Sequence, residues 1–86
     1  MPRISYFYGI SIQMFFDDHP PPHIHAKYNE FRARFDIRTG EVLSGRLPPQ
    51  ATRLVQDWIA KRDAELASNW TRMENGLDMV YIEGLE

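Results

Sequence analysis

The 86-residue chain contains no cysteine, which excludes disulfide bonds, thiolate metal ligands and cysteine nucleophiles. It also lacks an apolar run of roughly twenty residues, the length that a transmembrane helix requires. The N-terminal segment has no long apolar stretch either, so we expect no signal peptide. Glycine-rich phosphate loops and serine nucleophile motifs are missing as well. Together these absences predict a cytoplasmic protein with no membrane partner.

The length of the chain predicts a single domain over residues 1–86, because a chain this short cannot bury two separate cores. We expect a β-rich part over residues 1–46, a helical part over residues 48–76, and a tail over residues 77–86 that can add an edge strand. With 43% hydrophobic and 26% charged residues, the composition is that of an ordinary globular domain and not of a disordered chain.

Apolar and polar side chains alternate through the first half of the chain, which is typical of strands with one buried face. The expected strands are residues 4–8, 10–16, 23–28, 31–37 and a short one from Val42 to near Gly45.

The second half has the spacing of an amphipathic helix that begins at Pro48-Pro49, where proline is tolerated in the first turn. Ser68-Asn69 is expected to break this helix and cap a second one, which stops at Gly76. The pattern therefore predicts an α+β fold, a small antiparallel sheet packed against one or two C-terminal helices.

Asn29-Glu30 separates the third and fourth expected strands and is predicted to form a tight hairpin turn, since Asn tolerates the left-handed conformation. A two-residue turn places Tyr28 opposite Phe31, His25 opposite Arg34, and His23 opposite Asp36. Side chains that oppose one another directly have Cβ atoms about 5 Å apart. This register predicts a carboxylate beside His23.

All three histidines lie in one stretch, Asp17-Asp18-His19-Pro20-Pro21-Pro22-His23-Ile24-His25. His23 and His25 project from the same side of a strand, and His19 can reach them from the proline-rich loop. Three histidines with an open position for water are typical of a catalytic zinc site. The sequence thus offers His19, His23 and His25 as ligands of zinc or another transition metal.

Two other interpretations of the histidines stay open. Asp36 could orient His23 for acid–base catalysis by His19, His23 and His25, with Arg34 stabilising a phosphoryl transition state, as in metal-free RNA cleavage. Alternatively, the rings only tie the proline-rich loop to the sheet through hydrogen bonds, with Asp17 or Asp18 closing the network.

Charge is distributed unevenly along the chain, whose net charge is −2. The segment from Lys27 to Arg53 has six basic and three acidic residues, whereas Leu54 to the end has three basic and seven acidic ones. One part of the surface could therefore face an anion, although the same pattern also fits two ordinary solvated faces.

Several short motifs resemble one known family. They are Met1-Pro2-Arg3-Ile4-Ser5, Tyr8-Gly9-Ile10, Met14 to Phe16, Asp18-His19, Pro21-Pro22-His23-Ile24-His25-Ala26, Asp36-Ile37, Thr39-Gly40-Glu41, Gly45-Arg46-Leu47-Pro48 and Asn69-Trp70. Together they cover nearly the whole chain and resemble a small bacterial family, domain of unknown function 4160. Asn29 departs from that pattern, because relatives tend to have glycine there.

This resemblance implies a setting and not a mechanism, since no catalytic residues come with the family. Its members look like products of two-gene cassettes of the toxin–antitoxin type. The implied partner is a small protein encoded by a neighbouring gene, and RNA is the substrate if the chain is a ribonuclease-like toxin. The competing expectation is a non-enzymatic interaction module that docks such a partner through a strand edge or the acidic helix.

Overall fold

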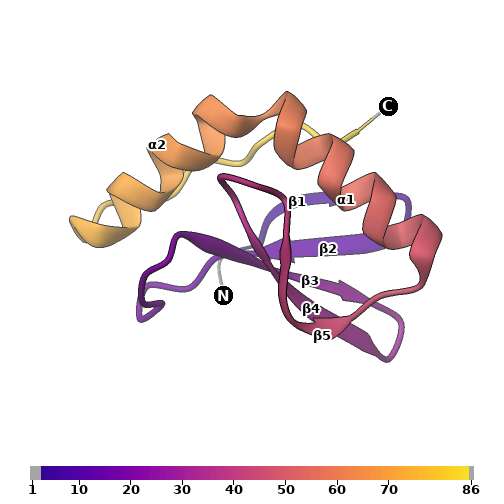
Figure 1. The fold of residues 1–86 in the computed structure, drawn as a ribbon. Helices are drawn as coiled ribbons and strands as arrows, with labels where there is room; N and C mark the ends of the chain where they lie inside the picture. The colour runs from indigo at the N-terminus through magenta and orange to yellow at the C-terminus, as the bar shows by residue number, and fades with distance from the viewer. Residues whose placement is uncertain (1–2, 86) are drawn as a thin grey trace.

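The computed structural model describes residues 3–85, which form an antiparallel sheet followed by two helices (Figure 1). The predicted α+β class, with helices after the sheet, is confirmed. No helix in this part of the chain has the length and apolar character needed to cross a membrane. The elements in order are β1 (Arg3–Phe7), β2 (Ile10–Gln13), β3 (His23–Tyr28), β4 (Phe31–Asp36), β5 (Val42–Arg46), α1 (Pro49–Lys61) and α2 (Asp63–Glu74).

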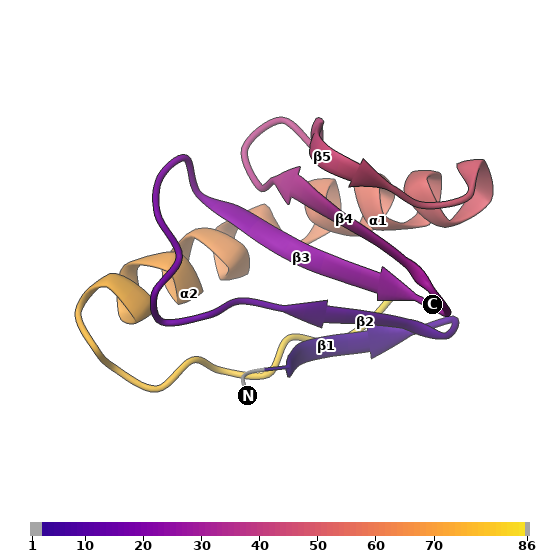
Figure 2. The ribbon, with the colours of Figure 1, turned by 90° about the horizontal axis from the view of Figure 1, so that it is seen from below.

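The five strands lie in the sheet in chain order, and each is antiparallel to its neighbours. Both helices lie on the same side of the sheet (Figure 1). Figure 2 looks onto the opposite side, where no element of residues 3–85 covers β2, β3 and β4. The sheet therefore has a helix-covered face and an open face.

Strand alternation sorts the side chains between these two faces. Ile24 and Ala26 of β3 and Phe35 of β4 are buried in the core, where Val55 and Trp58 of α1 are also fully buried. Burial of one large apolar side chain stabilises the fold by roughly 1.5–3 kcal/mol. Residues of β3 and β4 that alternate with these buried ones, namely Lys27, Arg32 and Arg34, are exposed.

The β3–β4 hairpin has the register that the sequence predicts. Tyr28 pairs with Phe31, His25 with Arg34, and His23 with Asp36. Asn29 has a φ of 53°, the left-handed conformation expected of the turn residue. This hairpin fixes the positions of His23 and His25 at the start of β3.

The break between the two helices lies at Arg62 and not at Ser68-Asn69, so that prediction is wrong. Arg62 departs from helical geometry, with φ −115° and ψ 27°, and α2 then runs without interruption to Glu74. Asn69 is buried in the middle of α2, and its side chain binds a distant segment instead of capping a helix.

The C-terminal tail after α2 is held by side chains and does not form a regular strand. The Asn69 amide donates to the Val80 carbonyl and accepts from the Val80 N–H, both at 2.8 Å. Ile82 N–H donates to the Ile4 carbonyl at 2.7 Å, and this is the single backbone hydrogen bond between the tail and β1 in residues 3–85. The edge strand expected within the tail of residues 77–86 is thus reduced to one backbone hydrogen bond.

We predict that Asn69→Ala destabilises the protein by about 1–3 kcal/mol, because it removes both hydrogen bonds to Val80. Urea unfolding measures this change. Ser68→Ala, at the exposed neighbouring position of α2, is the control and should shift the free energy of unfolding by less than about 0.5 kcal/mol. Equal stabilities of the two variants would show that Asn69 does not anchor the tail.

Candidate functional site

The loop between β2 and β3 turns back at Asp18 and fixes its carboxylate. Asp18 N–H donates to the Phe15 carbonyl at 3.1 Å, and Phe15 N–H donates to Asp18 Oδ2 at 2.9 Å. These two bonds close a tight turn, a common use of aspartate. Because Oδ2 is engaged by the backbone, the second oxygen, Oδ1, is left to face the histidines of β3.

Both β3 histidines direct a ring nitrogen at this same oxygen. His25 Nε2 lies 3.0 Å from Asp18 Oδ1, which is a hydrogen bond, and His23 Nε2 lies 3.6 Å from it. The two rings have centroids 5.0 Å apart. Asp18, His23 and His25 each offer one ligand atom, and these three atoms lie within 4.8 Å of one another. We call this group the His2Asp cluster.

The tautomer of the neutral His23 ring follows from its other ring nitrogen. Nδ1 lies 2.8 Å from the Pro21 carbonyl oxygen, which can only accept, so Nδ1 carries the hydrogen. In the neutral ring, Nε2 therefore presents a lone pair toward Asp18. This Nε2 is buried and has no hydrogen-bond partner among the described residues. The Trp70 ring of α2, with its centroid 5.6 Å away, helps to enclose the imidazole.

The structure brings Asp18 to the histidines, as the structural interpretation of the sequence allowed. The metal and catalytic interpretations pointed instead to His19 and Asp36. His19 is exposed and stands outside the His2Asp cluster, although it lines the hollow beside it. Asp18, one residue earlier, is the residue that the Phe15 turn directs inward. Position in the sequence made Asp17 an equal candidate, and the hydrogen bonds with Phe15 select Asp18.

Asp36 pairs with His23 in register, but the expected contact between them does not form. Its carboxylate instead accepts hydrogen bonds from the backbone N–H, Nε and Nη2 of Arg38, at 2.7, 3.3 and 3.1 Å. The Arg38 guanidinium holds the pKa of Asp36 below its usual value, chiefly through these side-chain hydrogen bonds. Asp36 therefore belongs to the β4–β5 turn.

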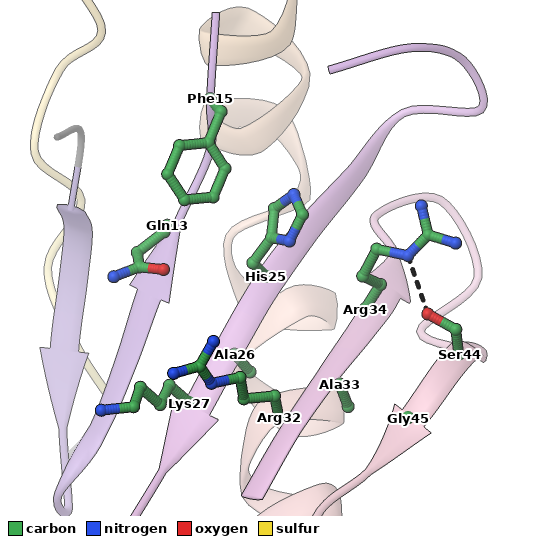
Figure 3. A pocket seen from close by; sticks show the side chains of 10 residues that line it. All are labelled: Gln13, Phe15, His25, Ala26, Lys27, Arg32, Ala33, Arg34, Ser44 and Gly45. Atoms are coloured by element: carbon green, nitrogen blue, oxygen red, sulfur yellow. Dashed lines mark hydrogen bonds between the residues drawn. The ribbon is translucent and has the colours of Figure 1, made fainter. Parts of the chain in front are cut away.

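Arg34 stands beside the His2Asp cluster with its charged end available. Its Nε donates to Ser44 Oγ at 2.8 Å, and its two terminal nitrogens have no partner among residues 3–85. It lines a hollow of about 470 Å³ together with Asp18, His19 and His23. Arg34 and His25 also line a groove of about 630 Å³ on the open face, where Figure 3 shows their side chains rising toward the same side.

Comparison with known proteins places the chain in a family. The fold and the His2Asp cluster define a small α+β protein with a candidate divalent-metal centre. The chain belongs to the family described as domain of unknown function (DUF4160), whose model matches residues 9–71, so the expected resemblance is confirmed. This range includes Asp18, His23, His25 and Arg34. No curated protein and no solved structure matches the chain.

We predict that Arg38→Gln raises the pKa of Asp36 toward its usual value, because it removes the main cause of the lowered pKa. A folded-state pKa below the unfolded one stabilises the protein above the unfolded pKa, and this stabilisation is lost as pH falls through the folded pKa. The stability advantage of the wild type over Arg38→Gln should therefore be largest near neutral pH and shrink in acid. Urea unfolding across pH measures it, and an advantage that does not change with pH would contradict the assignment.

Proposed function

We propose that the chain binds one divalent transition-metal ion through Nε2 of His23, Nε2 of His25 and a carboxylate oxygen of Asp18. The observation that carries this proposal is the His23 ring. Its Nε2 atom is buried, has no hydrogen-bond partner among the described residues, and lies 3.6 Å from Asp18 Oδ1. Buried polar atoms are nearly always satisfied, so this nitrogen points to a missing partner. A neutral imidazole nitrogen is a common ligand of metal ions, to which it donates its lone pair.

The distances within the cluster fit a metal ion. Ligand bonds of about 2.0–2.1 Å in a tetrahedral site place ligand atoms about 3.3 Å from each other. The separations from Asp18 Oδ1 to the two Nε2 atoms, 3.0 and 3.6 Å, bracket that value. All three ligand atoms lie within 4.8 Å of one another.

The atoms next to the ligands support the same conclusion. Metal-binding histidines usually donate their second ring N–H to a backbone carbonyl or carboxylate, which fixes the ring. His23 does this with the Pro21 carbonyl. The Asp18 carboxylate is likewise fixed, by the Phe15 amide. A purely structural role for the histidines would explain these bonds but not the unsatisfied Nε2 of His23.

Two histidines and one carboxylate leave coordination positions for water or a substrate, as in catalytic zinc sites and non-haem iron sites. A metal ion held by these three residues would supply an activated water molecule. Arg34, which lines the adjoining hollow, can then bind an anionic group of the substrate. The proposed activity is therefore metal-assisted hydrolysis of an anionic substrate.

The prediction is that protein prepared without a histidine tag binds about one zinc ion per chain. Asp18→Asn and His25→Ala each remove a ligand and should weaken zinc binding by more than about tenfold. Isothermal titration calorimetry measures the affinity, and elemental analysis identifies the metal taken up in the cell.

The matched control is His19→Ala, which removes an exposed histidine from the same loop but outside the cluster. It should bind zinc as tightly as the wild type. If His19→Ala loses zinc while Asp18→Asn retains it, the three-histidine ligand set of the sequence is correct and the His2Asp cluster is not the site.

A second candidate function, metal-independent RNA cleavage by a toxin of a two-gene module, is favoured by the hydrogen bond between His25 and Asp18. That pair can act as a general base, and the terminal nitrogens of Arg34 can stabilise a phosphoryl transition state. The family resemblance, which implies a two-gene cassette of the toxin–antitoxin type, supports a bacterial cytoplasmic setting and a small partner protein encoded by the neighbouring gene. His23, with its side chain 4% exposed, is less suited to proton transfer with a substrate.

If this second function is correct, the chain expressed alone inhibits growth, and co-expression of the neighbouring gene restores it. His25→Ala and Arg34→Gln should each abolish the inhibition at equal protein levels, because each removes one of the two proposed catalytic groups. Growth curves and cellular RNA integrity measure the effect. Inhibition that persists in both variants would rule out this use of the site.

A further inference from the structure

A row of cationic side chains crosses the open face of the sheet. The strand register places Lys27 of β3 opposite Arg32 of β4, and Arg32 opposite Arg46 of β5. All three residues are exposed. Figure 3 shows Lys27 and Arg32 side by side on the open face. Three neighbouring strands therefore present positive charge at the same level.

This row costs stability in the free protein. Directly opposed side chains have Cβ atoms about 4.5–5.5 Å apart, and like charges at that distance repel. Within residues 3–85, none of the three cations has a carboxylate oxygen within 4.0 Å. The chain has twelve acidic residues and a net charge of −2, so the basic row does not reflect a basic composition. An anionic ligand is the partner that relieves this repulsion.

A second row lies beside the first. Gln13 pairs with His25, His25 with Arg34, and Arg34 with Ser44. These four residues line the groove of about 630 Å³, together with Lys27 and Arg32. The positive charge thus extends over two rows and three strands, an area that fits a chain of phosphates better than a single phosphate ion.

Aromatic rings lie at the margins of the same face. Tyr6 of β1 pairs with Ser11, and Ser11 pairs with Lys27, so Tyr6 lies in line with the cationic row, two strands from Lys27. Its side chain is half exposed. Phe15 lines the groove and meets the His25 ring edge-on, with centroids 4.7 Å apart. A basic groove with aromatic rings is the surface on which single strands bind, because bases stack on the rings while cations hold the phosphates.

We propose that the open face binds single-stranded nucleic acid, with phosphates on Lys27, Arg32, Arg34 and Arg46 and bases against Tyr6 and Phe15. A duplex is not the expected ligand, because the helices that could enter its major groove lie on the other side of the sheet. The proposal rests on the open face alone and stands without a bound metal. It goes beyond the proposed function, with which it shares one residue, His25.

Fluorescence anisotropy with labelled oligonucleotides of about 12 nucleotides, as single-stranded RNA, single-stranded DNA and duplex, tests the proposal. With four phosphate contacts, log K should fall with log salt concentration with a slope of about −3. Arg32→Glu should weaken binding of the single strands by more than tenfold. Arg53→Glu makes the same charge change at an exposed position of α1 and should leave the affinity within about twofold.

RNA and DNA strands differ in the 2′-hydroxyl, so a preference for either one identifies the natural ligand and supports the proposal. It is overturned if the wild type fails to bind single strands at low salt, if duplex or dextran sulfate binds as tightly, or if Arg53→Glu weakens binding as much as Arg32→Glu. Asp18→Asn separates this surface from the metal site. It should lose zinc and keep the oligonucleotide, whereas Arg32→Glu should do the reverse.

Discussion

The turn at Asp18 is the constraint on which the candidate site depends. One carboxylate oxygen accepts the Phe15 N–H, and this bond leaves the other oxygen facing His23 and His25. The sheet by itself positions only the two rings. Without the turn, they would stand at the start of β3 with no anionic neighbour, since the opposing Asp36 is engaged by Arg38. A loop-to-strand contact therefore completes a site that the strand pairing prepares.

The His2Asp cluster and the open face meet at β3. His25 contributes to both, while Arg34, its partner on β4, lines both the hollow and the groove. Strand alternation explains this arrangement, because the residues that do not face the core all emerge on one side. Since both helices cover the opposite side, that surface stays accessible to a ligand (Figure 2). The fold thus places the His2Asp cluster beside the cationic groove.

The sequence predicted the elements that depend on local periodicity, and the β3–β4 register shows why. Alternation and one tolerant turn residue, Asn29, were enough to pair His23 with Asp36. Whether these two side chains touch was not predictable in the same way. The Asp36 carboxylate binds Arg38 in the following turn instead of His23. Strand pairing follows from the alternation of apolar and polar residues. The partner of a charged side chain depends on which other charged groups the fold brings near it.

Asp18 and Asn69 illustrate the same limit. Either Asp17 or Asp18 could face the histidines on sequence grounds, and only the hydrogen bonds at Phe15 select Asp18. Asn69 was expected to cap a helix, as asparagine often does. Instead, its side-chain NH2 and carbonyl oxygen both bind the backbone of Val80 in the C-terminal tail. Asp18 contacts His25 of β3 and Asn69 contacts Val80 of the tail, so both roles depend on how separate segments meet in the fold.

The most direct test of the central claim is an anomalous-scattering crystal structure of the protein grown with zinc. The account predicts one strong peak, about 2.0–2.2 Å from Nε2 of His23, Nε2 of His25 and a carboxylate oxygen of Asp18. A peak coordinated by His19 in place of Asp18, or no peak between the two β3 rings, would contradict it.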